Sequence, residues 1–180
     1  MVVFDSAFLL LVIDPRAKAP SDLTTGEPVA KATERVEYLI KTLSGDKEKI
    51  IIPTPVLSEV LVHAGTATEK YLEVLNNQAT FRIAPFDQKA AIEAAVAMRD
   101  ALDRGGHRID AAKPDATKTK IKFDRQIVAI AKAEGAHTIY SDDEDVFKYG
   151  QRAGLKVIRT SELDLPPEDP QMKMDLSPAD

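Results

Sequence analysis

The stretch Phe123–Val146 reads FDRQIVAIAKAEGAHTIYSDDEDV, and the order of its elements indicates the fold class. Residues 123–134 carry apolar side chains at helical spacing and are followed by Gly135, a favoured helix terminator. Residues 138–140 have the composition of a short strand, and acidic residues follow them directly. We therefore expect a helix, then a strand, then a polar loop.

Strand-like and helix-like segments alternate along most of the chain. Strands are predicted at 2–4, 50–52, 81–84, 138–140 and 155–158, and helices at 7–13, 29–44, 55–64, 67–78, 87–103, 123–134 and 145–153. This alternation predicts a single-domain α/β fold with a central parallel sheet of about four to five strands and helices on both faces. The lysine-rich segment 107–122 has little periodicity and is predicted to be an exposed loop.

Composition narrows the classes of function. The 180 residues fit one globular domain, and the absence of cysteine excludes disulfides, thiolate metal sites and cysteine nucleophiles. Any metal site must therefore use oxygen ligands. No apolar run is long enough to span a membrane and no signal peptide is recognisable, so we expect a cytoplasmic protein with no membrane association.

The negative net charge is concentrated at the C-terminus. Residues 161–180 contain six acids and one lysine, which equals the whole excess of −5, so the rest of the chain is neutral on balance. We expect residues 1–160 to form the domain and the acidic, proline-containing residues 161–180 to form a mobile tail. Residues 104–125 contain seven basic residues and three acids, a local excess that favours contact with phosphate, although a solvated insertion is an equal alternative.

Four acids are expected at the carboxyl ends of the predicted strands, where open parallel sheets form their binding sites: Asp5, Glu59, Asp124 and Asp143. Singly, Asp5 and Asp143 have an ordinary explanation as helix N-caps, and Glu59 as a solvated acid. Asp124 instead falls within the apolar stripe of its helix, so it is predicted to point inward. Clustered carboxylates repel one another, and no lysine or arginine lies near Asp5 or Asp143 in sequence. A divalent cation is therefore predicted.

Together these segments resemble the PIN-domain nuclease family, which includes the VapC-type toxin ribonucleases. The resemblance covers residues 1–160 and rests on VVFDS at 2–6, TPVLSEVL at 54–61, FDRQIVAIAKAEG at 123–135 and TIYSDDEDV at 138–146. It implies that one or two Mg²⁺ or Mn²⁺ ions are bound by the catalytic residues Asp5, Glu59, Asp124 and Asp143. Asp145 would assist and Ser141 would orient a carboxylate, while the neighbouring Asp142 leaves open which acid is the fourth ligand.

The resemblance also implies an activity and its partners. The chain would hydrolyse phosphodiester bonds in single-stranded or structured RNA as an endoribonuclease, through a metal-activated water rather than a protein nucleophile. It would be the toxin of a toxin-antitoxin pair. The expected protein partners are therefore an antitoxin and, in a homodimer, a second copy of the chain. The residues expected to bind RNA are Lys113, Lys118, Lys120, Lys122 and Arg125.

Other functions fit less well. A phosphatase of the haloacid dehalogenase type needs a second Asp two residues after the first, where this chain has Ala7. A receiver domain needs paired acids after the first strand, and nucleotide-binding enzymes need a glycine-rich turn; neither is recognisable here. The main alternative is a non-catalytic PIN-like RNA-binding or scaffold domain, although such a surface would gain from losing the four acids.

Overall fold

A five-stranded parallel sheet forms the centre of the computed structural model, which describes residues 1–104 and 118–167. The strand order is β3-β2-β1-β4-β5. The central strand β1 (Val2–Phe4) pairs with β2 (Ile50–Pro53) on one side and with β4 (Thr138–Tyr140) on the other, while β3 (Phe81–Ala84) and β5 (Lys156–Ile158) form the edges. The predicted parallel sheet is confirmed.

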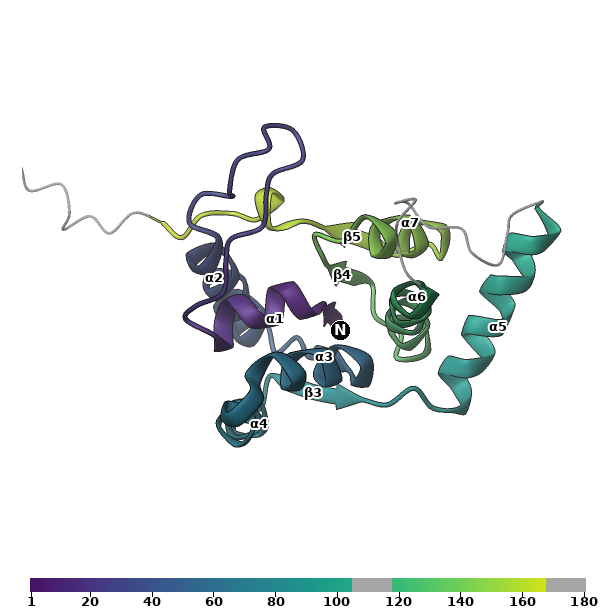
Figure 1. The fold of residues 1–180 in the computed structure, drawn as a ribbon, viewed down its shortest axis with the longest axis horizontal. Coiled ribbons are helices and arrows are strands. Elements are labelled where there is room, and N and C mark those ends of the chain that lie inside the picture. The colour runs from purple at the N-terminus through teal and green to yellow at the C-terminus, as the bar shows by residue number, and fades with distance from the viewer. Residues whose placement is uncertain (105–117, 168–180) are drawn as a thin grey trace, which may run out of the picture.

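Helices cover both faces of this sheet, as the alternation of segments predicts. They are α1 (Ser6–Ile13), α2 (Ala32–Gly45), α3 (Thr54–Ala64), α4 (Thr68–Asn77), α5 (Gln88–Asp103), α6 (Lys118–Ala133) and α7 (Glu144–Arg152), with short 3₁₀ turns η1 (Gly65–Ala67) and η2 (Thr160–Glu162). Figure 1 shows α2 and α5 at opposite ends of the molecule, and α5 packs mainly against α6.

An aromatic cluster lies beneath the carboxyl edge of the central strands. The ring centroids of Phe4, Phe8 and Tyr140 are 5.4 to 5.7 Å apart, in tilted and edge-to-face contacts. All three side chains are buried. Since Phe4 precedes Asp5 and Tyr140 precedes Ser141, this packing fixes the place where two polar residues leave the core.

The start of α6 corrects the sequence prediction. Residues 118–122 were expected in a loop, but the helix begins at Lys118. Ile121 is 3% exposed and lies seven residues before the buried Val128, so the apolar stripe continues one turn further than expected. The surrounding lysines hide this single apolar position in the sequence. The remainder of the predicted loop, residues 107–117, lies outside the described residues.

The chain remains packed for a few residues beyond the predicted domain boundary. Leu163 is buried, and its carbonyl oxygen accepts a hydrogen bond from the guanidinium of Arg35 on α2. Residues 168–180 of the predicted tail are not among those that the structure describes. Within the described ranges, none of the helices has the length and apolar character that crossing a bilayer requires.

Candidate metal centre

Asp5 lies at the junction of β1 and α1, buried beneath the sheet edge. Its residue is 6% exposed, and one carboxylate oxygen accepts the backbone N–H of Ser6 at 2.7 Å, which caps α1. The other oxygen accepts the hydroxyl of Ser141 at 2.6 Å. Both partners of this carboxylate are therefore neutral groups.

Asp143 occupies the equivalent junction after β4. Its Oδ1 accepts the backbone N–H groups of Asp145 at 2.8 Å and Val146 at 3.2 Å, and so caps α7. Its own backbone N–H donates to the Ser141 hydroxyl at 3.1 Å. Ser141, which is fully buried, thus connects Asp143 to Asp5 through one hydroxyl group.

Two further carboxylates enter from helices and complete the cluster. Asp124 on α6 is 7% exposed and Asp145 on α7 is 1% exposed. An oxygen of each lies within 4.8 Å of the other and of an Asp143 oxygen. Asp124 points inward, as the apolar stripe of its helix predicts. The name acidic cluster is used below for Asp124, Asp143 and Asp145.

Lys120 reaches into the acidic cluster from the first turn of α6. Its Nζ lies 2.8 Å from Asp124 Oδ2, 2.8 Å from Asp143 Oδ2 and 3.8 Å from Asp145 Oδ2. The sequence prediction assigned this lysine to RNA and did not foresee its place among the acids. The signal was present, because a lysine four residues before an aspartate faces it whenever both are helical.

Asp142 has a different role from its neighbour. Its two carboxylate oxygens accept the backbone N–H of Thr160 at 2.9 Å and the Thr160 hydroxyl at 2.5 Å. Its backbone carbonyl accepts a hydrogen bond from Arg159 at 3.0 Å. Asp142 therefore anchors the segment after β5, and the geometry favours Asp143 as the acid that faces the cluster.

Glu59 lies on the exposed side of α3 rather than inside the cluster. The helix buries Val56 and Val60 and leaves the Glu59 side chain toward solvent. Its charge is nevertheless close enough to contribute to the raised pKa of Asp5. Glu59 is thus a neighbour of the buried acids that remains accessible from solvent.

Burial dominates the electrostatics of Asp5 and Asp124. It raises the pKa of Asp5 to about 6, despite the hydrogen bonds from Ser141 and Ser6, and the negative charges of Asp143 and Glu59 act in the same direction as burial. Burial also raises the pKa of Asp124 to about 7, although Lys120 opposes this shift. Both groups hold protons at a pH where ordinary carboxyls have lost them.

Asp143 contacts the same Lys120 ammonium as Asp124, but its pKa shifts in the opposite direction. Burial acts to raise its pKa, yet the contact with Lys120 and the two backbone N–H donors outweigh burial and hold the pKa below its usual range. Its side chain is 28% exposed against 9% for Asp124, so desolvation weighs more heavily on Asp124. The pKa of Lys120 is raised, because its bonds to Asp124 and Asp143 overcome the effect of burial.

This set of donors fits a hard divalent cation. Carboxylate oxygens are the ligands that Mg²⁺ and Mn²⁺ prefer, and several of them within 4.8 Å suit coordination of one ion after small adjustments. The ammonium of Lys120 already stands among these oxygens as a cation. The cluster therefore requires positive charge, and either a lysine or a metal ion supplies it.

The residues predicted to bind RNA do not share the same surroundings, and two of them cannot be compared with the rest. Lys113 lies outside the described residues, as does the side chain of Lys118. Lys122 is exposed on α6. Arg125 is half-buried, with its guanidinium 5.1 Å from the centroid of the Tyr149 ring and one nitrogen 3.4 Å from the sulfur of Met98.

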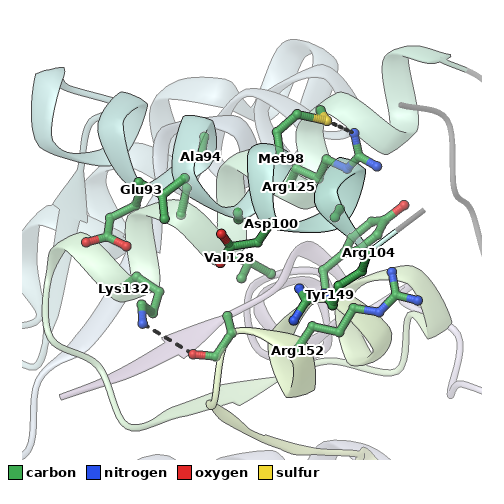
Figure 2. A pocket seen from close by; sticks show the side chains of 15 residues that line it. Glu93, Ala94, Met98, Asp100, Arg104, Arg125, Val128, Lys132, Tyr149 and Arg152 are labelled. Atoms are coloured by element: carbon green, nitrogen blue, oxygen red, sulfur yellow. Dashed lines mark hydrogen bonds between the residues drawn. The ribbon is translucent and has the colours of Figure 1, made fainter. Parts of the chain in front are cut away.

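Arg125 belongs to a pocket formed by α5, α6 and α7, of about 170 Å³. The pocket has an apolar floor that includes Ala97, Val128 and Ala129. Figure 2 shows Lys132 and Glu93 at one end and Arg125 and Arg152 at the other. Helix α6 thus carries Arg125 in this pocket and Asp124 in the acidic cluster.

Solved structures resemble this chain over most of its length. A chain of VapBC2 from Rickettsia felis, bound to a DNA fragment from its promoter, superposes with a TM-score of 0.57 at 15% identity, over 88% of this chain and 98% of that chain. A chain of FitAB bound to an IR36 DNA fragment gives a TM-score of 0.58 at 17% identity, over 91% and 98%. The chain has a VapC-like PIN fold. A chain of DNA-bound VapBC from Salmonella typhimurium agrees, with a TM-score of 0.55 at 15% identity over 88% and 97%.

The PIN fold is established by this likeness in structure. No protein-family model matches the sequence, and no curated protein does. At 15 to 17% identity, similarity to solved structures shows the fold alone. The chemistry available to the acidic cluster, Asp5 and Glu59 therefore depends on their own geometry.

Proposed function

We propose that this PIN-fold chain is a divalent-metal-dependent endoribonuclease of the toxin type. The observation that carries the proposal is the meeting of the acidic cluster at the carboxyl edge of the sheet, beside the buried Asp5. Mg²⁺ or Mn²⁺ would be held by Asp5, Glu59, Asp124 and Asp143, with Asp145 assisting. When bound, the ion supplies an activated water and neutralises charge on the phosphodiester.

The protein groups position the ligands for that chemistry. Ser141 fixes the orientation of Asp5 through a 2.6 Å hydrogen bond, and the first N–H groups of α7 fix Asp143. These bonds lock the carboxylates before substrate arrives, so little reorganisation is needed. Glu59 faces solvent on α3, which suits a ligand that closes on the ion from the open side.

RNA would approach along α6. Arg125 lies at the pocket between α5, α6 and α7 and can meet a phosphate group there. Lys122 is exposed but lies two residues from both Lys120 and Asp124, so it faces away from the acidic cluster on α6. A toxin of this kind would be held in check by an antitoxin protein. The support for that partner is the likeness to VapBC and FitAB, together with the sequence motifs. A homodimer is proposed on the motifs alone.

Metal binding and cleavage test the proposal together. Calorimetric titration with MnCl₂ should show binding by the wild type that Asp143→Asn weakens strongly. Cleavage of a mixed-sequence single-stranded RNA should require added Mg²⁺ or Mn²⁺ and stop with chelator. Asp142→Asn is the matched control, since Asp142 bonds Thr160 outside the cluster. Cleavage that persists in chelator contradicts the metal-dependent mechanism.

One observation favours the alternative of a non-catalytic RNA-binding or scaffold domain. The ion pairs of Lys120 already supply positive charge to Asp124 and Asp143, so a structural cluster of this kind needs no metal. In that case the same titration shows no Mn²⁺ binding, and RNA binds without being cut. The two functions are thus separated by one pair of measurements.

A further inference from the structure

Lys120 supplies positive charge to the acidic cluster in the absence of metal. Its ammonium contacts acids from two helices, Asp124 on α6 and both Asp143 and Asp145 at the start of α7. Without a cation, these carboxylates would repel one another across less than 4.8 Å. The lysine therefore joins the two helices at the point where their charges oppose folding.

We propose that Lys120 is a built-in counter-ion that exchanges with the divalent ion. In the metal-free protein the ammonium occupies the oxygens of Asp124 and Asp143, and it withdraws when the metal binds them. This inference rests on the proposed function, because it uses the same metal site. The proposal adds Lys120 as a residue that sets the metal affinity although it is not itself a metal ligand.

Competition follows from the atoms involved. The ammonium uses Oδ2 of both Asp124 and Asp143 at 2.8 Å. A Mg²⁺ ion binds carboxylate oxygens at about 2.1 Å, so on the same oxygens it would lie within roughly 4 to 5 Å of the ammonium. At that separation two cations repel, and the divalent ion attracts the carboxylates more strongly. Metal binding therefore weakens the hold of the carboxylates on the ammonium and favours its release into water.

The position of Lys120 allows it to leave without unfolding α6. It lies in the first turn of the helix, and its side chain is 40% exposed. Its four-carbon stem is flexible and carries the ammonium readily into water. Asp124 and Asp143 are held from their backbones by α6 and by the cap of α7, so they stay in place when the lysine moves.

The first test compares Lys120→Met with Lys122→Met by calorimetric titration of the full chain with MnCl₂. Lys122 is an exposed lysine on the same helix and controls for the loss of one charge. If Lys120 occupies the site about 90% of the time, its removal should tighten the dissociation constant about tenfold, because the competent fraction rises to one. Lys122→Met should stay within about twofold of the wild type.

The second test follows Lys120 itself in the unaltered protein. Acetylation of its amine by an activated ester, measured by mass spectrometry, should be slow without metal and accelerate when MgCl₂ is added. Lys122 provides the internal reference, with no change expected. This readout does not depend on RNA cleavage or on a variant that has to fold, so it decides the question even if Lys120→Met is unstable.

The outcomes separate this inference from the proposed function. Equal or weaker Mn²⁺ binding by Lys120→Met, with clear binding by the wild type, overturns the exchange and leaves the metal-dependent nuclease standing. Binding by Lys120→Met alone supports the exchange but contradicts a metal-dependent wild type. If no form binds Mn²⁺ and Lys120 remains protected in MgCl₂, both are overturned.

Discussion

The two ends of α1 each carry a buried aspartate, and the two carboxylates have different kinds of hydrogen-bond partner. Asp5 begins the helix and, within the described residues, accepts hydrogen bonds from a serine hydroxyl and a backbone N–H. Asp14 ends it and is bonded to the guanidinium and backbone of Arg16 and to the ring of His63, at 2.9 to 3.3 Å. Burial raises the pKa of Asp5 to about 6, whereas the bonds from Arg16 hold the pKa of Asp14 far below its usual range.

The difference lies in the charge of the groups that surround each carboxylate. Asp14 has a cationic partner of its own in Arg16, so its charge is compensated within the fold. Asp5 faces other carboxylates, Asp143 and Glu59, whose charges add to the cost of its own. If Asp5 is a metal ligand, as we propose, a bound cation supplies the positive charge that these neighbours do not.

The largest difference between the two aspartates is expected when each one is neutralised in turn. Asp5→Asn should lower metal-dependent RNA cleavage at least about a hundredfold, because a metal ligand contributes several kcal/mol to the transition state. Asp14→Asn should retain cleavage and Mn²⁺ affinity but lower the Tm by several degrees, since it removes the charge that Arg16 and His63 bind. Cleavage rates and melting curves of both variants check this. A large loss of cleavage in a well-folded Asp14→Asn protein contradicts it.

The pH dependence of stability should also have opposite signs at the two acids. The folded-state pKa values of Asp5 and Asp124 are about 6 and about 7, above the ordinary 3.8, so the folded metal-free protein binds more protons than the unfolded chain between these values. The free energy of unfolding should therefore fall as pH rises from about 4 to 7.5, by on the order of 3 kcal/mol for Asp5. The lowered pKa of Asp14 gives stability that is present above its ordinary pKa and lost in more acidic solution.

Chemical denaturation of the metal-free protein across this pH range measures the effect. Asp5→Asn should flatten the decline above pH 4, and Asp14→Asn should leave that decline unchanged. Mn²⁺ affinity should follow the reverse trend and tighten as pH rises, because its ligands must be deprotonated. A wild type whose stability rises between pH 5 and 7.5 without metal would show that the pKa values of Asp5 and Asp124 are not raised in the folded protein.

Local patterns were enough for the sheet, the helices and the inward position of Asp124. Strand composition, helix terminators and the apolar stripe are properties of neighbouring residues, so they are visible in one sequence. The distinction between Asp142 and Asp143 was not visible, because it depends on Thr160, which is 18 residues away and reaches Asp142 only in the folded chain. Lys120 was misplaced because a lysine-rich segment hid Ile121, the apolar residue that extends α6 to include it.

A smaller effect is expected where Asp5 meets its neutral partner. Ser141→Ala removes the 2.6 Å hydrogen bond and leaves Asp5 with one backbone donor. The loss should be about 1–3 kcal/mol at pH 8, where the carboxylate is charged, and less at pH 5, where Asp5 is protonated. Denaturation at the two pH values measures it, with the exposed Ser58→Ala on α3 as the control. An equal loss at both pH values indicates a packing effect rather than support of a charged group.

The smallest effect is expected at the other end of α1, where Asp14 has more than one partner. His63 is 51% exposed and makes a single 3.0 Å contact with Asp14 Oδ2, whereas Arg16 donates to both oxygens from its backbone and guanidinium. His63→Ala should therefore change the Tm by no more than about 2 °C, because the carboxylate keeps its charged partner Arg16 and loses one contact with a half-exposed ring. Arg16→Ala should cost more than His63→Ala, although its side chain is also exposed. If His63→Ala instead lowers the Tm as much as Asp14→Asn does, the two partners are not redundant, and Asp14 depends on a histidine at the edge of solvent much as Asp5 depends on Ser141.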